Sequence, residues 1–422
     1  MRNSASNADY PMKALIINST DIIGGAGLAG YAICKALNEH TEFQTEILCG
    51  IKGGSDGTST QILTGKAEFL YRIVRHPMIM PRIQQENFPL TARTIMSIVS
   101  DKSPDVFNLH NIHGGYFPYR IIPKLREIAP IVVTMQDMWF LTGHCAFAYD
   151  CQGWHTGCSN CGHEDWYPFA DRAATAKHWR MKRKIVQESD IVFATCSQWL
   201  KDEAKKSPIL QGKEIVHIYN PIDMDTFKPI DQALAREVFR IPNVKNVLAF
   251  GAADISDPRK GLEPFIKSIT EEFVIRNNLY LLLMGLDRHG MVKLVPSFLP
   301  CQHVENASHP LVRTLVYGAA DIFVFPTLAD NLSNMLIESM ACGRGIVTFD
   351  VGGNREIVLT DRTGYLAKYR DYNDFHVGIE RLISSRGVRE KMSAECRTFA
   401  LHHFSMDACG KEYAMTFKRV MN

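Results

Sequence analysis

Two acidic residues, Asp330 and Glu338, lie eight positions apart in the stretch "FPTLADNLSNMLIESMACG" (325–343). The pattern predicts the end of a strand, a loop, and a helix that begins near Ser333 and ends at Gly343. Glu338 then lies about one and a half turns into the helix, at roughly 3.6 residues per turn. Carboxylates at this spacing can accept hydrogen bonds from the vicinal hydroxyls of two neighbouring sugar rings. The alternative is an acid stabilised by the helix dipole together with a surface Glu.

A pair of cations, Arg259 and Lys260, follows another expected strand in "GAADISDPRKGLEPF" (251–265). Both residues come where the chain enters a helix. Two cations beside a helix N-terminus form a site for a pyrophosphate group. The alternative is a solvated pair of surface charges.

A glycine-rich turn joins a strand to a helix in "NSTDIIGGAGLAGYAICKAL" (18–37). Backbone N–H groups at the start of such a helix suit a phosphate, and Gly24, Gly25 and Gly27 allow a ligand to approach closely. The dinucleotide fingerprint is misplaced, and the next expected strand ends at Gly50 without an acidic residue, which argues against a nicotinamide cofactor. A tight turn with no ligand is the alternative.

The elements that must position these residues alternate between short apolar runs and helical patterns, as in parallel βαβ units. The runs are apolar throughout, which favours strands covered on both faces. We expect strands at 13–18, 45–49, 105–110, 131–135, 190–195 and 214–220, and a second series at 244–252, 279–285, 321–326 and 345–350.

The two series of strands predict two doubly wound domains. The first spans 12–222, with a cysteine-rich insert at 144–168, and the second spans 223–404. The segment 220–230, with two prolines and two aspartates, is the expected linker. The last amphipathic stretch, 405–422, is expected to cross back to the first domain. Ligands of such folds bind at the carboxyl ends of the strands.

The composition of the 422-residue chain is that of a soluble globular protein. Its net charge of +2 argues against wholesale nucleic-acid binding, and no apolar run is long enough for a spanning helix. The first eleven residues are polar and lack the apolar core of a secretory signal. Eleven cysteines in such a chain indicate a reducing, cytoplasmic environment.

Four of the cysteines are clustered with the spacing C-x5-C-x6-C-x2-C. Four thiolates can make a closed structural zinc site, and in a cytoplasmic chain a metal is favoured over disulfides. Disulfides or redox-active thiols, and four unligated thiols, are the alternatives. The candidate ligands are Cys145, Cys151, Cys158 and Cys161, for which His144, His155 and His163 could substitute.

The segment "RAATAKHWRMKRK" (172–184) holds six Lys or Arg residues and no acid. With Trp179, Met181, Ile185 and Val186 it can form a basic amphipathic helix that rests on an anionic membrane. A solvated helix face is the alternative.

Together these motifs resemble the retaining GT-B glycosyltransferases of family four, in particular the colanic-acid and exopolysaccharide branch. The resemblance covers nearly the whole chain. It includes "GGAGLAGYAICKAL", "NLHNIHGGY", "TMQDMWFLTGHCAFAYDCQGWHTGCSNC", "YNPIDMDTFKP", "DPRKG" and "DNLSNMLIESMACG…VGGNREIV". It implies two Rossmann-like domains that face each other across a cleft, with the nucleotide-sugar donor on the C-terminal one.

The resemblance also implies roles for donor-side residues. Asp330 matches the first acid of the family's pair, which grips the donor sugar, and Glu338 matches the second, which takes the nucleotide ribose. Lys260 matches the lysine of the donor phosphate. The other implied donor residues are Gly25 and Ala26 in the loop that reaches the phosphates, Arg259 beside Lys260, and Asn331 and Leu332, whose backbone N–H groups contact the donor sugar.

On the acceptor side, Gln136 stands where the family usually has His, followed by Asp137. A Gln amide hydrogen-bonds but does not carry a proton near neutral pH. His110 and His113 flank a strand end near the expected acceptor, and a structural role is the alternative for either. Further departures from the family are Asp330 in place of Glu, Arg344 and Gly345 in place of Thr-Pro, and Pro221 in place of Gly.

The implied reaction is transfer of a hexose from a nucleotide diphosphate sugar, linked to UDP or GDP, to a glycan or lipid-linked glycan, with retention of configuration, in surface polysaccharide biosynthesis. Asp330, Lys260 and Gln136 are the expected catalytic residues, and no catalytic metal is expected. The expected location is the cytoplasm, or the inner face of the plasma membrane as a peripheral protein. Another nucleotide-sugar enzyme, such as an epimerase or hydrolase, and a non-catalytic glycan- or nucleotide-binding protein are the alternatives.

Overall fold

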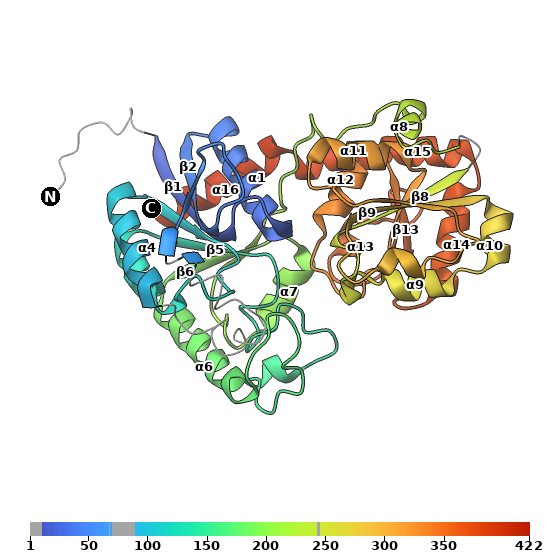
Figure 1. Ribbon diagram of the computed structural model, residues 1–422. Helices are drawn as coiled ribbons and strands as arrows, with labels where there is room; N and C mark the ends of the chain where they lie inside the picture. The colour runs from blue at the N-terminus through green and yellow to red at the C-terminus, as the bar shows by residue number, and fades with distance from the viewer. Residues whose placement is uncertain (1–10, 67, 70–88, 243–244) are drawn as a thin grey trace. The chain divides into compact units, whose positions relative to one another are not determined.

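The computed structural model describes residues 11–66, 68, 69, 89–242 and 245–422. These residues form two units (Figure 1). Unit 1 contains the described residues up to Cys196, with Leu200–Pro221 and Met406–Asn422, and unit 2 contains Ser197–Trp199 and Ile222–Ser405. The polar N-terminal segment noted above lies outside the described residues except for Pro11.

Unit 1 is built on a parallel sheet of seven strands in the order β3-β2-β1-β4-β5-β6-β7. Six of them lie where the apolar runs predict strands. The seventh, β3, was missed because its sequence, Ser-Thr-Gln, carries no apolar run. The strands are β1 (Met12–Thr20), β2 (Phe43–Ile51), β3 (Ser59–Gln61), β4 (Val106–Leu109), β5 (Ile131–Met135), β6 (Ile191–Thr195) and β7 (Ile215–His217).

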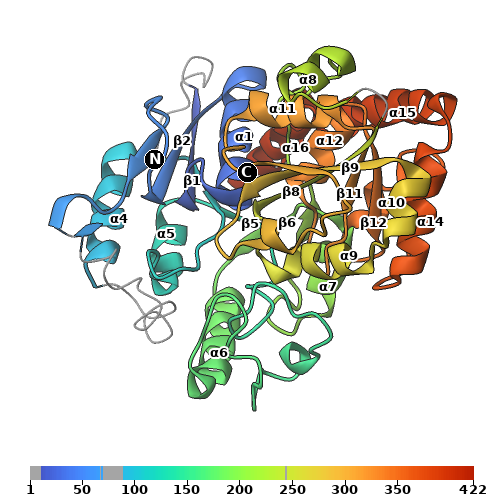
Figure 2. The same ribbon diagram turned by 45° about the vertical axis from the view of Figure 1, so that its right-hand side comes forward.

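Among the described residues, the α-helices of unit 1 include α7 (Gln198–Lys206), whose first two residues belong to unit 2. The helix α1 lies beside the last helix of the chain, α16, in both views (Figures 1 and 2). The α-helices are α1 (Gly24–His40), α4 (Pro89–Lys102), α5 (Ile122–Ile128), α6 (Arg172–Glu188), α7 (Gln198–Lys206) and α16 (Met406–Met421), and the 3-10 turns are η1 (Tyr119–Ile121) and η2 (Gly153–His155).

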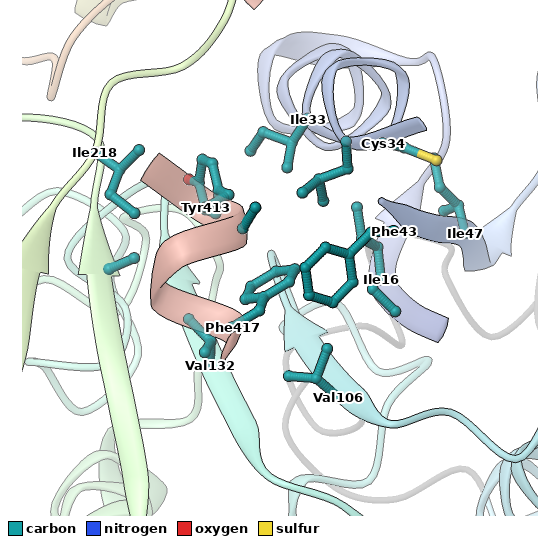
Figure 3. Packing of buried hydrophobic residues seen from close by; sticks show 14 of the residues in the cluster. Ile16, Ile33, Cys34, Phe43, Ile47, Val106, Val132, Ile218, Tyr413 and Phe417 are labelled. Atoms are coloured by element: carbon teal, nitrogen blue, oxygen red, sulfur yellow. The ribbon is translucent and has the colours of Figure 1, made fainter. Parts of the chain in front are cut away.

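The C-terminal helix α16 contributes to the core of unit 1 (Figure 3). Its Tyr413 and Phe417 are fully buried beside Ile33 of α1 and Val132 of β5. The rings of Phe417 and Phe43 meet edge to face, with 5.5 Å between their centroids. Burial of one such side chain stabilises a fold by about 1.5–3 kcal/mol, so α16 is an integral part of this unit rather than a tail.

Unit 2 has a parallel sheet of six strands in the order β10-β9-β8-β11-β12-β13. Four of these strands match the expected runs. The other two are the short edge strands: β10 has the mixed sequence Cys-Gln-His-Val, and β13, Gly-Tyr-Leu-Ala, is apolar but only four residues long. The strands are β8 (Asn246–Asp254), β9 (Leu279–Leu286), β10 (Cys301–Val304), β11 (Ile322–Phe325), β12 (Gly345–Phe349) and β13 (Gly364–Ala367).

The helices of unit 2 form two layers. One layer contains α9, α10 and α14, and the other contains α8, α11, α12 and α15 (Figure 2). Their bounds are α8 (Gln232–Val238), α9 (Leu262–Ser268), α10 (Glu271–Asn277), α11 (Pro310–Ala319), α12 (Asn334–Ala341), α13 (Asn354–Ile357), α14 (Tyr372–Ile383) and α15 (Arg386–Phe404), with 3-10 turns η3 (Pro258–Lys260) and η4 (Met291–Leu294).

The expected linker is divided after Pro221, and its remainder packs on unit 2. Arg397 of α15 donates hydrogen bonds to the backbone oxygens of Phe227, at 2.7 Å, and Met224, at 3.1 Å. Asp223 caps the turn within this segment by accepting from the N–H of Asp225 at 3.0 Å. The segment is therefore ordered by its own unit. Among the described residues, no helix has both the length and the apolar character needed to span a bilayer.

Each sheet contains a point at which the strand order reverses, between β1 and β4 in unit 1 and between β8 and β11 in unit 2. Open α/β sheets bind ligands outside the carboxyl ends of the strands at such points. The glycine-rich turn and His110 follow β1 and β4, and Lys260 and Asp330 follow β8 and β11. The fold thus places the predicted site residues of each unit at its own ligand-binding edge.

Candidate functional site

The predicted cations and the first predicted acid of unit 2 form one cluster. The Lys260 ammonium lies 2.5 Å from Asp330 Oδ2, and Arg259 Nη1 lies 3.5 Å from the same oxygen. Burial by itself raises the pKa of Asp330, but the charges of Lys260 and Arg259 outweigh burial and hold this pKa below its usual value. Burial and the neighbouring Arg259 lower the pKa of Lys260. Asp330 is therefore ionised and nearly enclosed, with 9% of its surface exposed.

The loops after β8 and β11 hold this cluster through close backbone contacts. Asp257 caps the η3 turn by accepting from the N–H of Arg259 at 2.9 Å. The Leu328 N–H donates to Arg259 O at 2.8 Å. Gly261 has φ +72°, and a Cβ there would lie 2.0 Å from Pro326 O, so no other residue fits without displacing the backbone. The two loops therefore position Lys260 and Asp330 as one assembly.

The glycine pair after β12 supports the same loop from the other side. Gly352 has φ +58°, and a Cβ there would lie 1.9 Å from Asp330 O. The Gly353 N–H donates to Asn331 O at 2.6 Å, and the Asn331 N–H donates to Asp330 Oδ1 at 3.1 Å. This packing explains why glycines follow β12, and it fixes the backbone of Asp330 and Asn331. Leu332 follows them and is buried.

The second predicted acid, Glu338, belongs to a different network. Its carboxylate forms a two-point ion pair with Arg313 of α11, at 2.9 Å and 3.1 Å, and accepts from the Tyr317 hydroxyl at 2.9 Å. Burial raises the pKa of Glu338, while Arg313 opposes this shift. Arg313 and Tyr317 were not predicted from the sequence. Their spacing of four residues on an amphipathic helix, which puts them on one face, was the available signal.

In unit 1 the predicted acceptor-side residues line one small pocket, with a volume of ≈ 10 Å³, at the carboxyl ends of β4 and β5. His113 Nε2 lies 3.1 Å from Asp137 Oδ2, and Asp137 Oδ1 accepts from the backbone N–H of Trp139 at 2.8 Å. The structure thus brings together all four residues of this prediction, which are His110, His113, Gln136 and Asp137.

Gln136 and Asn220 form a reciprocal amide pair. Each side-chain amide donates to the oxygen of the other at 2.9 Å. The pair joins the end of β5 to the segment after β7, across 84 positions of sequence. Gln136 is therefore held in one orientation by a neutral partner, which a protonated imidazole would not reproduce.

His110 is more deeply buried than His113. Burial lowers the pKa of His110 to about 3, and its Nε2 lies 2.5 Å from Asn108 Oδ1. Its Nδ1 lies near the backbone of α1, 3.8 Å from a Cβ placed on Gly30. This neutral, enclosed imidazole favours the structural interpretation that the sequence left open for His110.

Several polar atoms of the pocket residues have no hydrogen-bond partner among the described residues. They are Asn111 Oδ1, His113 Nδ1 and Trp139 Nε1, together with His110 Nδ1. A buried polar atom left without a partner costs about 1–3 kcal/mol.

The glycine-rich turn of unit 1 opens α1 as expected, with Gly24 at φ +72°. Gly25 and Ala26 lie in the first turn of α1, and Asn18 Nδ2 donates to Ala26 O at 2.9 Å. Asp21 fixes the preceding loop, because its carboxylate accepts from the N–H groups of Gly53 and Gly54 at 2.7 Å and 3.0 Å. Burial raises the pKa of Asp21, but these hydrogen bonds lower it overall. Asp21, an acid directly after the strand, was not predicted from the sequence.

The four predicted metal ligands line one cavity of ≈ 120 Å³ in unit 1. His144 Nε2 lies 3.6 Å from Cys161 Sγ, and the Gly143 N–H donates to Cys158 Sγ at 3.1 Å. All four thiols are free. Within the described part of the chain, however, no three His, Cys, Asp or Glu side chains are arranged to hold a metal ion. The cysteines Cys145, Cys151, Cys158 and Cys161 therefore gather as expected, but their geometry gives no support to the predicted zinc.

The basic segment forms α6, but its apolar side is covered by the unit itself. Trp179, Ile185 and Val186 are buried, and Trp179 Nε1 donates to Trp154 O at 2.9 Å. Of the expected apolar face, Met181 alone keeps part of its surface exposed. Lys182 also turns inward, where its ammonium donates to Trp139 O and burial lowers its pKa to about 7. The cations that remain exposed are Arg172, Lys177, Arg180, Arg183 and Lys184.

The two parallel sheets and their helix layers define a GT-B fold. Sucrose-phosphate synthase from Thermosynechococcus elongatus has a TM-score of 0.72 at 14% identity, over 97% of this chain and 99% of that one. Anabaena Alr3699/HepE, solved in complex with UDP-glucose, has a TM-score of 0.67 at 14% identity, over 97% of this chain and 100% of that one. Similarity at this level of identity establishes the fold alone.

Residues 244–385, which carry the cluster around Lys260 and Asp330, match the family model of glycosyl transferases group 1. The chain is also similar to a D-inositol 3-phosphate glycosyltransferase of Mycobacterium sp. (strain JLS), at 28% identity over 218 residues. That alignment covers 45% of this chain and 47% of the relative, so the chain spans about half the length of this curated relative. The similarity to group 1 glycosyl transferases therefore includes the segment that carries Lys260 and Asp330.

Proposed function

We propose that the protein transfers a hexosyl group from a nucleoside diphosphate sugar, linked to UDP or GDP, to a hydroxyl of a glycan or lipid-linked glycan, with retention of configuration. The observation that carries the proposal is the cluster of Lys260, Arg259 and Asp330. It lies at the strand-order reversal of unit 2, within the segment that matches the family model.

In this proposal Lys260 binds the diphosphate. Its ammonium has three N–H donors, of which Asp330 takes one, and a diphosphate oxygen accepts from another. Lys260 and Arg259 then stabilise the negative charge that develops on the leaving diphosphate. No catalytic metal is needed for this step. Gly25 and Ala26, at the N-terminus of the 17-residue helix α1, offer backbone N–H groups to the same kind of anion.

The sugar and the ribose are assigned to the acid pair. Asp330 and the backbone N–H groups of Asn331 and Leu332 hold the donor sugar. Glu338 has two oxygens with about four lone-pair sites. Arg313 and Tyr317 take three of them, and the site that remains on Oε1 can accept from a ribose hydroxyl. The buried ion pair thus orients the carboxylate for that contact.

A surface-polysaccharide role is proposed from the sequence resemblance to the exopolysaccharide branch. The acceptor is then lipid-linked and lies at the inner face of the plasma membrane. The exposed cations of α6 support contact with anionic lipid by charge alone, without insertion of apolar side chains. Each such cation contributes about 1 kcal/mol near a charged surface.

A non-catalytic nucleotide- or glycan-binding protein is the second candidate. The observation in its favour is the amide pair of Gln136 and Asn220, which leaves a neutral group where the family has an ionisable one.

Turnover separates the two candidates. The purified protein is incubated with UDP-, GDP-, ADP- and dTDP-sugars, and release of nucleoside diphosphate is measured with and without a mixture of lipid-linked glycans. Release from one donor, with an NMR spectrum of the product that shows retention, supports the proposal. Binding of a donor without any release indicates the second candidate. The absence of both binding and release contradicts the proposed function.

A further inference from the structure

Three aromatic side chains of the cysteine-rich insert form one stack in unit 1. The rings of His163 and Trp166 lie nearly parallel, at 13°, with 3.8 Å between their centroids. The ring of Tyr149 lies 4.7 Å from that of Trp166, at an angle of 59°. Tyr149 is 38% exposed, and the other two side chains are half-buried. Part of the ring surface is therefore open to a ligand.

The backbone of the insert holds the stack in place. The Trp166 N–H donates to His163 O at 3.1 Å, and the Ala146 N–H donates to Tyr167 O at 2.8 Å. Tyr149 has φ +45°, a left-handed conformation that costs a bulky residue about 1–3 kcal/mol. Backbone strain of this kind clusters at sites that bind ligands, because there it positions a side chain.

A cavity lies beside the stack. His163 and Trp166 belong to the lining of the ≈ 120 Å³ cavity that also contains the four cysteines. Ser159 and Asn160 line the same cavity and are exposed, so the cavity has polar groups at its outer edge. An apolar cavity of about 150 Å³ holds a benzene ring, so this cavity is on the scale of one six-membered ring. Aromatic walls with a few polar groups are typical of a small-ligand site.

The charge of the insert restricts the ligand. Residues 144–168 contain three acids, Asp150, Glu164 and Asp165, and no Lys or Arg. Phosphate groups, nucleic acids and anionic lipids are therefore disfavoured by like charge. An uncharged pyranose ring suits this surface better. Its C–H groups can lie on the negative face of an aromatic ring, while its hydroxyls hydrogen-bond to the carboxylate, amide and hydroxyl groups nearby.

We propose that the stack of Tyr149, Trp166 and His163, with the cavity beside it, binds one pyranose ring of the acceptor glycan, apart from the ring that reacts. The site rests on the proposed function for the identity of the glycan as the acceptor. Its place in unit 1 suits this role, because Tyr167, the residue after Trp166, packs its ring 5.6 Å from that of His113 in the acceptor-side pocket. The site favours acceptors that contain more than one sugar.

The test uses the full chain and four probes, the methyl α-glycosides of glucose, mannose, galactose and N-acetylglucosamine. Saturation-transfer NMR measures their binding. Tyr149→Gly removes the ring at a position whose φ suits glycine, so this variant should keep its melting temperature. We expect at least one probe to bind, and Tyr149→Gly to weaken its binding by about tenfold.

Two further variants and a control complete the series. Trp166→Ala should also weaken binding of the probe, and Trp166→Phe, which keeps an aromatic ring, should lose less. Ile128→Ala is the control, because it removes an exposed apolar side chain of the same unit that lies outside the insert. This variant should bind the probe as the unmodified protein does.

Two results would overturn the sugar site. One is that none of the four probes binds to the unmodified protein. The other is that Tyr149→Gly binds the probes as well as the unmodified protein does. Vesicles of phosphatidylcholine, with and without phosphatidylglycerol, test the lipid alternative. If Tyr149→Gly loses vesicle binding while no probe binds, the stack contacts lipid and the proposal is wrong.

Calorimetry with UDP-glucose and GDP-mannose, together with the turnover assay, keeps the two proposals apart. Donor binding and turnover without probe binding refute the sugar site alone. Probe binding that depends on Tyr149, without donor binding or turnover, refutes the proposed function alone.

Discussion

The ion pair between Arg313 and Glu338 gives a sharp test of how unit 2 is held together. Arg313→Ala removes a guanidinium that donates two hydrogen bonds to the carboxylate and further bonds to the backbone of Ser308 and Ala307. Both side chains of the pair are at least nine-tenths buried. Glu338 is then left as a buried charge whose remaining side-chain partner is Tyr317.

The expected cost is large. Removing one partner of a buried ion pair typically costs about 3–5 kcal/mol. For a unit of this size, each kcal/mol lost from the free energy of unfolding lowers the melting temperature by about 2–4 °C. The Arg313→Ala variant should therefore melt about 6–20 °C below the unmodified protein. Arg276→Ala is the matched control, because Arg276 and Glu380 form an exposed Arg–Glu pair in the same unit. Exposed pairs are worth about 0–1 kcal/mol, so this variant should lose a few degrees at most.

The pH dependence of the variant follows from the direction of the Glu338 pKa. Burial already raises this pKa above 4.5, and loss of the Arg313 charge raises it further. A carboxyl whose pKa is higher in the folded state destabilises the fold while ionised, and this penalty disappears as pH falls through the folded pKa toward the unfolded value. The difference in the free energy of unfolding between Arg313→Ala and the unmodified protein should therefore become smaller below neutral pH, by up to about 1.4 kcal/mol per pH unit.

The assay is urea denaturation, followed by tryptophan fluorescence and far-ultraviolet circular dichroism, at several pH values between 5 and 8. A loss no larger than that of the Arg276 control would refute the reasoning that this pair is an essential buried contact. If the difference in the free energy of unfolding grows as the pH is lowered, Glu338 is not the ionised partner of Arg313.

The remaining predictions concern the candidate sites. Lys260→Ala should weaken binding of the preferred nucleotide sugar by about 1.5–3 kcal/mol, measured by calorimetry. The control is Lys267→Ala, which removes an exposed lysine of α9 and should leave the affinity unchanged. Equal affinities of the two variants would contradict the donor assignment. Gly261→Ala should lower both melting temperature and donor affinity, because its Cβ would overlap the backbone at Pro326; an unchanged melting curve would count against the tight loop contact. Gln136→His should leave the initial transfer rate unchanged or lower it, since a His cannot make both bonds of the amide pair. A positioned acid–base group raises a rate by roughly a hundredfold or more. A gain of about tenfold or more in the Gln136→His variant would therefore show that Gln136 is a weakened version of the family histidine.

Much of the fold was predictable from the sequence because it depends on local patterns. Continuous apolar runs mark strands that are covered on both faces, and ten of them appear as strands in the two sheets. The strands that the pattern missed, β3, β10 and β13, are segments of three or four residues at the sheet edges. Edge strands bury less surface, so their sequences carry a weaker signal.

The sequence also indicated which residues gather, since loops that follow neighbouring parallel strands meet at one edge of a sheet. The family resemblance implied the group of His113, Gln136 and Asp137 and the group of Lys260 and Asp330, and the topology accounts for their proximity within each unit. Lys182 was predicted among the surface charges, although it occupies the same helical stripe as Trp179 and Ile185 of α6, which indicates an inward position.

Only the tertiary structure decided how each of these side chains is used. Glu338 pairs with Arg313 across 25 positions and Gln136 with Asn220 across 84, and sequence alone does not specify contacts made between elements that are distant in the chain. The spacing of the cysteines suggested a metal, whereas the fold lines a cavity with them and leaves the thiols without metal-binding geometry. Spacing along a chain restricts which groups can meet, but the distances and angles that chemistry requires are set by the packing of whole elements.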